Sequence, residues 1–331
     1  MIAETATTTN DASLVQGVAQ DSAHLNNLQV SFAEREITDF NCSSRSQREN
    51  TSKMEVSEYQ EKNIHYLKEI DFLRTKSPIV KILQNMIVNF SHRSCAIESN
   101  TLELSESQEI WDRLNKSYNL NNLLKNEKFS PPSTISSSDK SEKEIIEVRN
   151  HLLATYFIYN TTHKLNQEIN IDGIKKVHRI MLEDTPMEKF CPYHNRKNMQ
   201  QAGKFRTFVV QSYGEPFTVY PYDVEVSALM EEFMKFYDES KNIAIHPIMI
   251  SCRLHASLAH IHPFYDGNGR VSRSIMAQYL ICNGYLPAIF HQVKREKYIN
   301  SLRKIQRGKD ASLLVFHQNE QMAKLFSRLN F

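Results

Sequence analysis

Apolar residues at helical spacing recur along most of the chain after about residue 78. They stand three or four positions apart, which places them on one face of a helix. The clearest run follows Ser77-Pro78, a pair typical of helix starts, and continues toward Phe90. The apolar positions that carry the pattern are Ile79, Ile82, Leu83, Met86, Ile87, Ile110, Leu114, Ile145, Leu152, Tyr156, Ile174, Val177, His178, Met181, Val226, Leu229, Met230 and Phe233. The pattern predicts a mainly helical fold.

Local signals predict where several helices begin and end. Ser105 with Gln108, and Ser141 with Glu144, fit the capping box, in which two side chains satisfy free backbone N–H groups at a helix start. We predict further helices after Pro247 and over residues 271–281, the second ending at Asn283-Gly284. Two more are expected between residues 298 and 329.

One pair of segments has the composition of β-strands. Residues 205–211 and 217–220 are rich in β-branched and aromatic residues, and they flank a short polar turn, which predicts a hairpin. No alternation of strands and helices and no repeat is evident. The fold class is therefore all-α, mainly helical, with one short β-hairpin.

Composition divides the chain into three parts. Residues 1–57 are polar with few aromatic residues, so we expect a mobile tail. A helical N-terminal segment, residues 58–140, ends in a loop rich in Pro and Ser at 131–138, and a core with C-terminal helices occupies residues 141–331.

Charge and cysteine usage exclude several classes of protein. The 40 basic and 38 acidic residues are interspersed, so the chain lacks the basic surface expected of a nucleic-acid-binding protein. The 5 cysteines include no C-x-x-C pair, which argues against disulfides and zinc and favours a reducing compartment. Neither a membrane span nor a signal peptide is evident. We expect a soluble, cytoplasmic protein with no nucleic-acid or membrane partner.

Candidate chemistry concentrates at residues 262–273, His-Pro-Phe-Tyr-Asp-Gly-Asn-Gly-Arg-Val-Ser-Arg. The glycines open a helix, whose free N–H groups and dipole favour a phosphate. Arg270 and Arg273 lie one turn apart there and oppose that dipole, so we expect a bound anion between them. His262 ends the preceding helix and suits a general base, while Asp266 is a hard oxygen ligand suited to Mg²⁺.

This segment resembles the H-P-F-x-D/E-G-N-G-R-x-x-R signature of the Fic-domain protein adenylyltransferases, and the resemblance extends over residues 77–310. It implies a helical fold and transfer of AMP from Mg-ATP to a Ser, Thr or Tyr hydroxyl of a target protein. It further implies that residues 206–220 form a flap that binds the protein substrate by strand addition. The roles it implies are base for His262, Mg²⁺ ligand for Asp266, anion hole for Gly267, Asn268 and Gly269, and outer-phosphate contacts for Arg270 and Arg273.

A second segment resembles the self-inhibitory motif S/T-x-x-x-E-G/N of the same family. It begins at Ser94, and Glu98 is implied to occupy the γ-phosphate position beside Arg273, within an inhibitory helix around residues 94–100. Ser99 departs from the usual Gly or Asn. Some relatives also use this glutamate to remove AMP, so removal is a secondary activity that the resemblance allows.

Several alternatives stay open on the sequence. The motif binds a diphosphate, so a Fic-type enzyme that transfers UMP, phosphocholine or phosphate is one alternative, and a nucleotide-sensing or partner-binding module without turnover is another. A homodimer is left open, as is the target. Tyr265 receives no role, Lys204 and Arg206 are interpreted as either target contacts or solvated, and His178, His255 and His260 are interpreted as ordinary core or surface residues.

Overall fold

A computed structural model describes residues 64–76, 79–120, 140–165, 167–190, 200–212, 218–290 and 294–306. These residues all lie within one compact unit, Tyr59–Phe331. The expected tail at 1–57, the helix start at Ser77-Pro78, the loop at 131–138 and a helix beyond residue 306 fall outside the described residues. The division into segments 58–140 and 141–331 stays a prediction.

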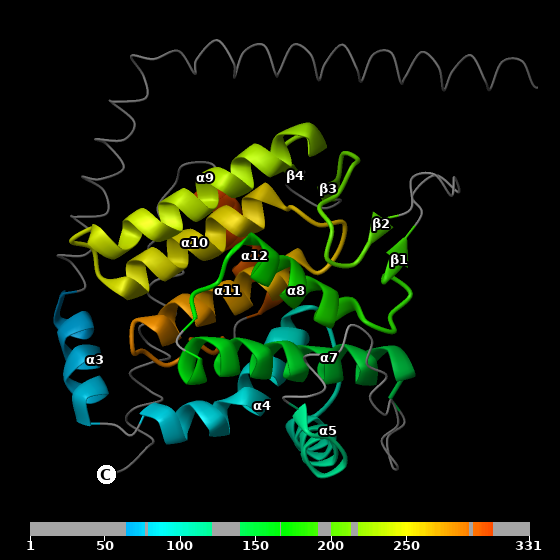
Figure 1. The fold of residues 1–331 in the computed structure, drawn as a ribbon, viewed down its shortest axis with the longest axis horizontal. Helices are drawn as coiled ribbons and strands as arrows, with labels where there is room; N and C mark the ends of the chain where they lie inside the picture. The colour runs from blue at the N-terminus through cyan, green and yellow to red at the C-terminus, as the bar shows by residue number, and fades with distance from the viewer. Residues whose placement is uncertain are drawn as a thin grey trace, which may run out of the picture. The chain divides into compact units, whose positions relative to one another are not determined.

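The described residues are mostly helical, which confirms the predicted fold class (Figure 1). A π-helical turn, Asn160–Lys164, continues α7, and 3-10 turns at Asp223–Glu225 and Ser240–Asn242 flank α9. None of the described helices has the length and apolar character needed to cross a bilayer. The helices are α3 (Ile64–Lys76), α4 (Ile79–Ile97), α5 (Leu104–Ser117), α7 (Glu142–Tyr159), α8 (Ile171–Leu182), α9 (Val226–Glu239), α10 (Pro247–Ile261), α11 (Asn268–Cys282) and α12 (Arg295–Gln306).

The strands form two short antiparallel pairs. β3 (Gln211–Ser212) pairs with β4 (Thr218–Val219), which confirms the predicted hairpin, although residues 205–210 lie outside its strands. A second pair, β1 (Lys189–Phe190) with β2 (Gln200–Gln201), was not predicted. Two paired residues per strand are too few to produce a detectable alternation of apolar and polar positions.

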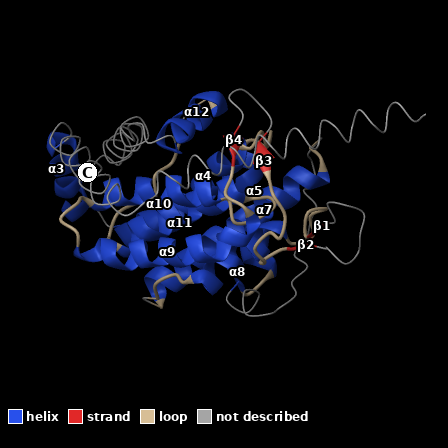
Figure 2. Ribbon diagram, turned by 90° about the horizontal axis from the view of Figure 1, so that it is seen from above, coloured by secondary structure: helices blue, strands red, loops and turns tan. Residues whose placement is uncertain are grey.

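Helix α11 lies at the centre of the described helices, in contact with α4, α7, α8 and α10 (Figures 1 and 2). Apolar residues stand on several of its faces, and Val271, Ile275, Met276 and Leu280 are completely buried. A helix that is apolar around its circumference is a core helix. The residues at its first turn are thereby held in a rigid setting.

Two helix starts test the predicted capping boxes. At α7 the box is confirmed, because the Ser141 hydroxyl accepts from the backbone N–H of Glu144 at 3.3 Å and the Glu144 carboxylate contacts Ser141 in return. The prediction for Ser105 and Gln108 is wrong, because α5 begins at Leu104. Glu106 instead accepts from the backbone N–H of Glu103 at 2.7 Å. An equally spaced pair two residues upstream therefore provides the cap.

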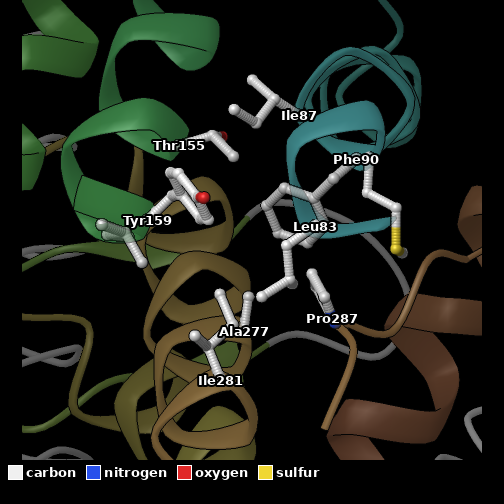
Figure 3. A pocket seen from close by; sticks show the side chains of 10 residues that line it. Leu83, Ile87, Phe90, Thr155, Tyr159, Ala277, Ile281 and Pro287 are labelled. Atoms are coloured by element: carbon white, nitrogen blue, oxygen red, sulfur yellow. The ribbon is translucent and has the colours of Figure 1, made fainter. Parts of the chain in front are cut away.

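A small apolar cavity of about 10 Å³ lies between α4, α7 and α11 (Figure 3). Leu83 and Phe90 of α4 point into it from one side, Tyr159 from α7 and Ala277 from α11 from the others. This volume is near the minimum that holds one water molecule, so the packing of α4 is nearly complete. The contact matters because the segment expected to be inhibitory, residues 94–100, begins at the other end of α4.

Replacing Leu83, which is 4 % exposed, is expected to weaken this packing. Leu83→Ala should lower the free energy of unfolding by about 2–5 kcal/mol because it removes buried methyl groups and enlarges the cavity. Leu83→Met conserves volume and should cost less than about 1.5 kcal/mol. Urea-induced unfolding measures both. A loss below about 1 kcal/mol for the alanine variant would contradict the packing described for α4.

Candidate functional site

The segment between α10 and α11 is a corner with two left-handed residues. His262 ends α10 with φ 50°, and Gly267 precedes α11 with φ 73°. The Asn268 side chain fixes the corner, because its Oδ1 accepts from the Phe264 N–H at 2.9 Å and its Nδ2 donates to the Phe264 carbonyl at 2.7 Å. The Asn268 side chain, which was expected to line an anion hole, therefore holds the loop instead. The groups that remain available to an anion are the backbone N–H groups in the first turn of α11.

The His262 imidazole is oriented by its neighbours. Its Nδ1 lies 3.2 Å from the Ala259 carbonyl, which only accepts, so Nδ1 carries the hydrogen and Nε2 presents a lone pair. Tyr220, next to β4, stacks on the ring at 3.8 Å between centroids and 19° between planes. Burial lowers the pKa of His262 to about 4. The ring is therefore neutral at pH 7, the form that a general base requires.

A cavity of about 410 Å³ opens above the first turn of α11. It is bounded by the corner, by the end of α4, by α7 and by the loop after α8. Its lining residues are Glu98, Lys143, Glu147, Leu182, Thr185, Pro186, Met187, His262, Tyr265, Asp266, Gly267, Asn268, Gly269 and Arg270. The fold thus brings the expected base, metal ligand, glycines and inhibitory glutamate to one cavity, while Arg273 lies buried behind its wall.

Arg273 is 1 % exposed and has four hydrogen-bond contacts through its guanidinium group. Its Nε donates to the Ser94 hydroxyl at 2.8 Å, and Nη2 donates to the Ser94 carbonyl at 2.9 Å and to a Glu98 carboxylate oxygen at 2.7 Å. Nη1 donates to the Tyr298 hydroxyl of α12 at 3.2 Å. Burial raises the pKa of Glu98, yet Arg273 outweighs it and holds that pKa below its ordinary value. The pair is therefore ionised.

Arg270 also has carboxylate partners. Its Nη1 lies 2.8 Å from Glu147 of α7, and its Nη2 lies 3.5 Å from Asp266. The anion expected between the arginines is thus supplied by protein side chains in this structure. Glu147 was not identified from the sequence, because its position on α7 becomes relevant only when α7 packs against α11.

Two residues allow Glu98 to approach the cavity floor. A Cβ added at Gly269 would lie 2.6 Å from the Glu98 carboxylate, closer than non-bonded atoms come, so a glycine is required there while Glu98 is in place. Ser99 has φ 73°. The family's Gly or Asn at this position suits the left-handed conformation, which other residues adopt at a cost of about 1–2 kcal/mol.

The expectation for Arg206 is wrong in both of its forms. The residue is 2 % exposed and therefore neither solvated nor available to a target. Its guanidinium donates to the carbonyl oxygens of His262 at 2.8 Å, Phe208 at 2.9 Å and Pro221 at 2.5 Å. Arg206 thus joins the corner before α11 to both sides of the hairpin. Lys204 is exposed.

His178 is a buried histidine, as expected, but it also positions the corner. Its Nδ1 accepts from the Gly203 N–H at 2.8 Å, so Nε2 carries the hydrogen and donates to the Asp266 carbonyl at 3.1 Å. Its ring stacks on Phe264 at 3.8 Å between centroids. Tyr265, which received no role, donates its hydroxyl hydrogen to the Met187 carbonyl and so connects the corner to the cavity wall. Partners from such distant segments give no local sequence signal.

Removing the Tyr220 ring is expected to raise the pKa of His262. Desolvation lowers that pKa, so water admitted by Tyr220→Ala should move it from about 4 toward about 6.5. Tyr220→Phe keeps the stacked ring and serves as the control, with an unchanged pKa. Histidine NMR titration of the nucleotide-free protein measures all three. Titration of His262 near pH 6.5 in the unaltered protein would contradict the described burial.

Glycine at position 99 is expected to stabilise the end of α4. Ser99→Gly should raise the free energy of unfolding by about 0.5–1 kcal/mol, because relief of the left-handed conformation exceeds the entropy cost of glycine. Ser99→Ala keeps the Cβ and should give no gain. Thermal unfolding of the two variants distinguishes them, and equal midpoints would count against strain at this residue.

Part of the chain, including most of the residues that line the cavity, is similar to known proteins. Residues 168–280 match the model of the Fic/DOC family. The chain is 28 % identical over 218 residues to the protein adenylyltransferase Fic of Drosophila persimilis and to that of Aedes aegypti, a stretch that covers 66 % of this chain and 36 % of each relative. The matched part therefore spans about a third of the length of these curated relatives.

Solved structures share the fold. Fic-1 from C. elegans superposes with a TM-score of 0.59 at 23 % identity, covering 80 % of this chain and 70 % of that structure. A Fic-domain-containing signaling protein from Bacteroides thetaiotaomicron superposes with a TM-score of 0.60 at 17 % identity, covering 79 % and 94 %. Residues 168–280, which include the corner, thus match the Fic/DOC family model, and the described fold resembles that of the two solved structures.

Proposed function

We propose that this chain is a protein adenylyltransferase, which transfers AMP from ATP to a Ser, Thr or Tyr hydroxyl of another protein. One observation carries the proposal. A neutral His262, with its Nε2 lone pair available, lies at the same cavity as the first turn of α11 and Arg270. A base and an anion-binding helix start are thereby combined, and the curated relatives named as adenylyltransferases support AMP as the transferred group.

In the proposed reaction, His262 Nε2 takes the proton of the target hydroxyl as the oxygen attacks the α-phosphorus of ATP. A phosphorus–oxygen bond forms to the target, the bond from the α-phosphorus to the bridging oxygen breaks, and pyrophosphate leaves. The backbone N–H groups at Gly269 and its neighbours, with the helix dipole, would stabilise the charge on the phosphates. Arg270 would add a cation at the same turn.

Asp266 fits the proposed role of Mg²⁺ ligand. Its carboxylate lines the cavity, and its side chain is 40 % exposed. Among the described residues no group of three or more His, Cys, Asp or Glu forms a metal site. A site with one carboxylate suits Mg²⁺, which takes its other ligands from phosphates and water. When bound, the ion would neutralise charge on the phosphate oxygens.

We further propose that the structure represents the inhibited state. Glu98 holds Arg273, the residue proposed to contact the outer phosphate, at 2.7 Å. Glu98 lines the cavity and Arg273 does not, so a γ-phosphate in the cavity would have to displace Glu98 to reach the guanidinium. Glu98 would thus set how often ATP binds in the reactive orientation. Removal of AMP by a water that Glu98 positions remains a secondary proposal.

The protein substrate is proposed to bind along the flap, residues 206–220. Arg206 ties the carbonyl oxygens of Phe208 and Pro221, on the two sides of the hairpin, to that of His262. A target segment added to the hairpin would therefore be held in register with the base.

A homodimer stays open. The described cysteines, Cys95, Cys252 and Cys282, are free thiols, which supports a reducing location such as the cytoplasm.

The test uses Glu98→Gly protein supplied with Mg-ATP and read by intact mass. This variant should gain the mass of AMP, on itself or on a protein of a cell lysate, faster than the unaltered chain. Adding His262→Ala should reduce the rate by about 10²–10⁴-fold, the usual contribution of a general base. His260→Ala, two residues earlier, is the matched control and should retain activity.

Three outcomes would redirect the proposal. Modification by UTP or CDP-choline in place of ATP would indicate another transferred group. Binding of ATP by Glu98→Gly without any mass gain would favour a nucleotide-sensing module. Full activity of the His262→Ala double variant would remove His262 as the base.

A further inference from the structure

We propose that His151, on α7, is a positioning residue that holds Arg273 against Glu98 through the hydroxyl of Ser94. The proposal rests on the inhibited state described above and adds a residue to it. His151 is completely buried, and it lies outside the sequence motifs and the cavity lining. Its role follows from the directions in which hydrogen bonds can run.

The hydrogen bond from Arg273 fixes the orientation of the Ser94 hydroxyl. Arg273 Nε can only donate, so Ser94 Oγ accepts at 2.8 Å. The Ser94 hydrogen is then available to the partner on its other side, His151 Nε2, at 2.7 Å. His151 Nε2 accepts this hydrogen if its own ring hydrogen is on Nδ1.

The other side of the ring is consistent with this assignment. Thr155 donates its hydroxyl hydrogen to the His151 carbonyl at 2.8 Å, so its oxygen is available to accept from His151 Nδ1 at 3.2 Å. Ser91 lies 2.9 Å from the same Thr155 oxygen and can donate to it. Each hydrogen in this series of hydrogen bonds, which runs from Ser91 through Thr155, His151 and Ser94 to Arg273, thus has one acceptor. The His151 ring therefore carries its hydrogen on Nδ1.

Because these hydrogen-bonded side chains are buried, each depends on its protein partner. Ser94 is 3 % exposed and Arg273 is 1 % exposed, so water cannot replace a lost partner. Burial, with Arg273 and Arg270 nearby, lowers the pKa of His151 to about 3, which keeps the ring neutral and able to accept. Without this acceptor the Ser94 hydroxyl would turn toward a carbonyl of its own helix, as buried serines in helices do. Its oxygen would then no longer be held toward Arg273.

The same face of α7 also holds the chain after Glu98. Glu147, one turn before His151, accepts from the Asn100 side chain at 2.8 Å and pairs with Arg270. Glu144, a further turn back, accepts from the Thr101 N–H at 2.9 Å. Helix α7 therefore fixes the inhibitory segment on both sides of Glu98, upstream through His151 and downstream through Glu147 and Glu144.

The test compares His151→Leu with His151→Gln. Leucine removes the acceptor, and ATP-dependent self-modification should rise about 5–10-fold, the effect of losing one buried hydrogen bond. Glutamine provides an Oε1 that accepts from Ser94, so its rate should stay within about twofold of the unaltered chain. Ser94→Ala removes the same contact and should match His151→Leu, with the double variant equal to either single one. In the Glu98→Gly background His151→Leu should have no further effect.

A second readout needs no nucleotide. The Arg273 Nε–H signal should be protected from solvent exchange in NMR spectra of the unaltered chain and of His151→Gln, and exchange-broadened in His151→Leu. An unchanged signal in His151→Leu overturns the proposal, as does activity equal to the unaltered chain while Glu98→Gly is activated. If Glu98→Gly shows no transfer but the NMR difference appears, the proposed function fails and the positioning role stands. If His151→Leu does not fold, Ser94→Ala carries both readouts.

Discussion

The charge of Arg273 is the constraint on which the rest of the site depends. A guanidinium that is almost fully removed from water must have an anion and hydrogen-bond acceptors, because an unpaired buried charge costs several kcal/mol. Ser94 of α4, Glu98 in the turn after α4, and Tyr298 of α12 meet that need from segments far apart in the sequence. In the proposed reaction, a nucleotide phosphate would take the place of Glu98. The competition between these two anions makes an inhibited and an active form of one site physically reasonable.

The corner before α11 also depends on polar side chains that stabilise it. The left-handed conformation of His262 makes this corner unfavourable on its own, whereas Gly267 at the other end adopts it freely, and polar side chains hold the corner in place. Asn268 holds it from within, His178 contacts it from α8, and Arg206 joins it to the hairpin. These contacts let the His262 imidazole face the cavity with a defined tautomer. A stiff corner of this kind suits a base that must meet an incoming hydroxyl at one place.

The sequence was informative where the structure depends on local rules. Helical periodicity predicted the core helices, and the glycines of the motif predicted the start of α11. The same rules missed whatever depends on packing between distant segments. Arg206 was interpreted as a surface residue because charged side chains usually are, and nothing nearby indicated three carbonyl oxygens to bind. Glu147 and His151 likewise gain their roles only when α7 packs against α4 and α11.

The absence of a side chain at Gly269 leaves a space that either the Glu98 carboxylate or a phosphate could fill, but not both. The space beside its Cα holds the Glu98 carboxylate here, and a phosphate that approached the backbone would need the same space. Any larger residue would have to push the Glu98 carboxylate aside, and it would narrow the space that a phosphate would need. In the proposed enzyme, inhibition by Glu98 and binding of the nucleotide would therefore depend on the same missing side chain, so a substitution there would change both.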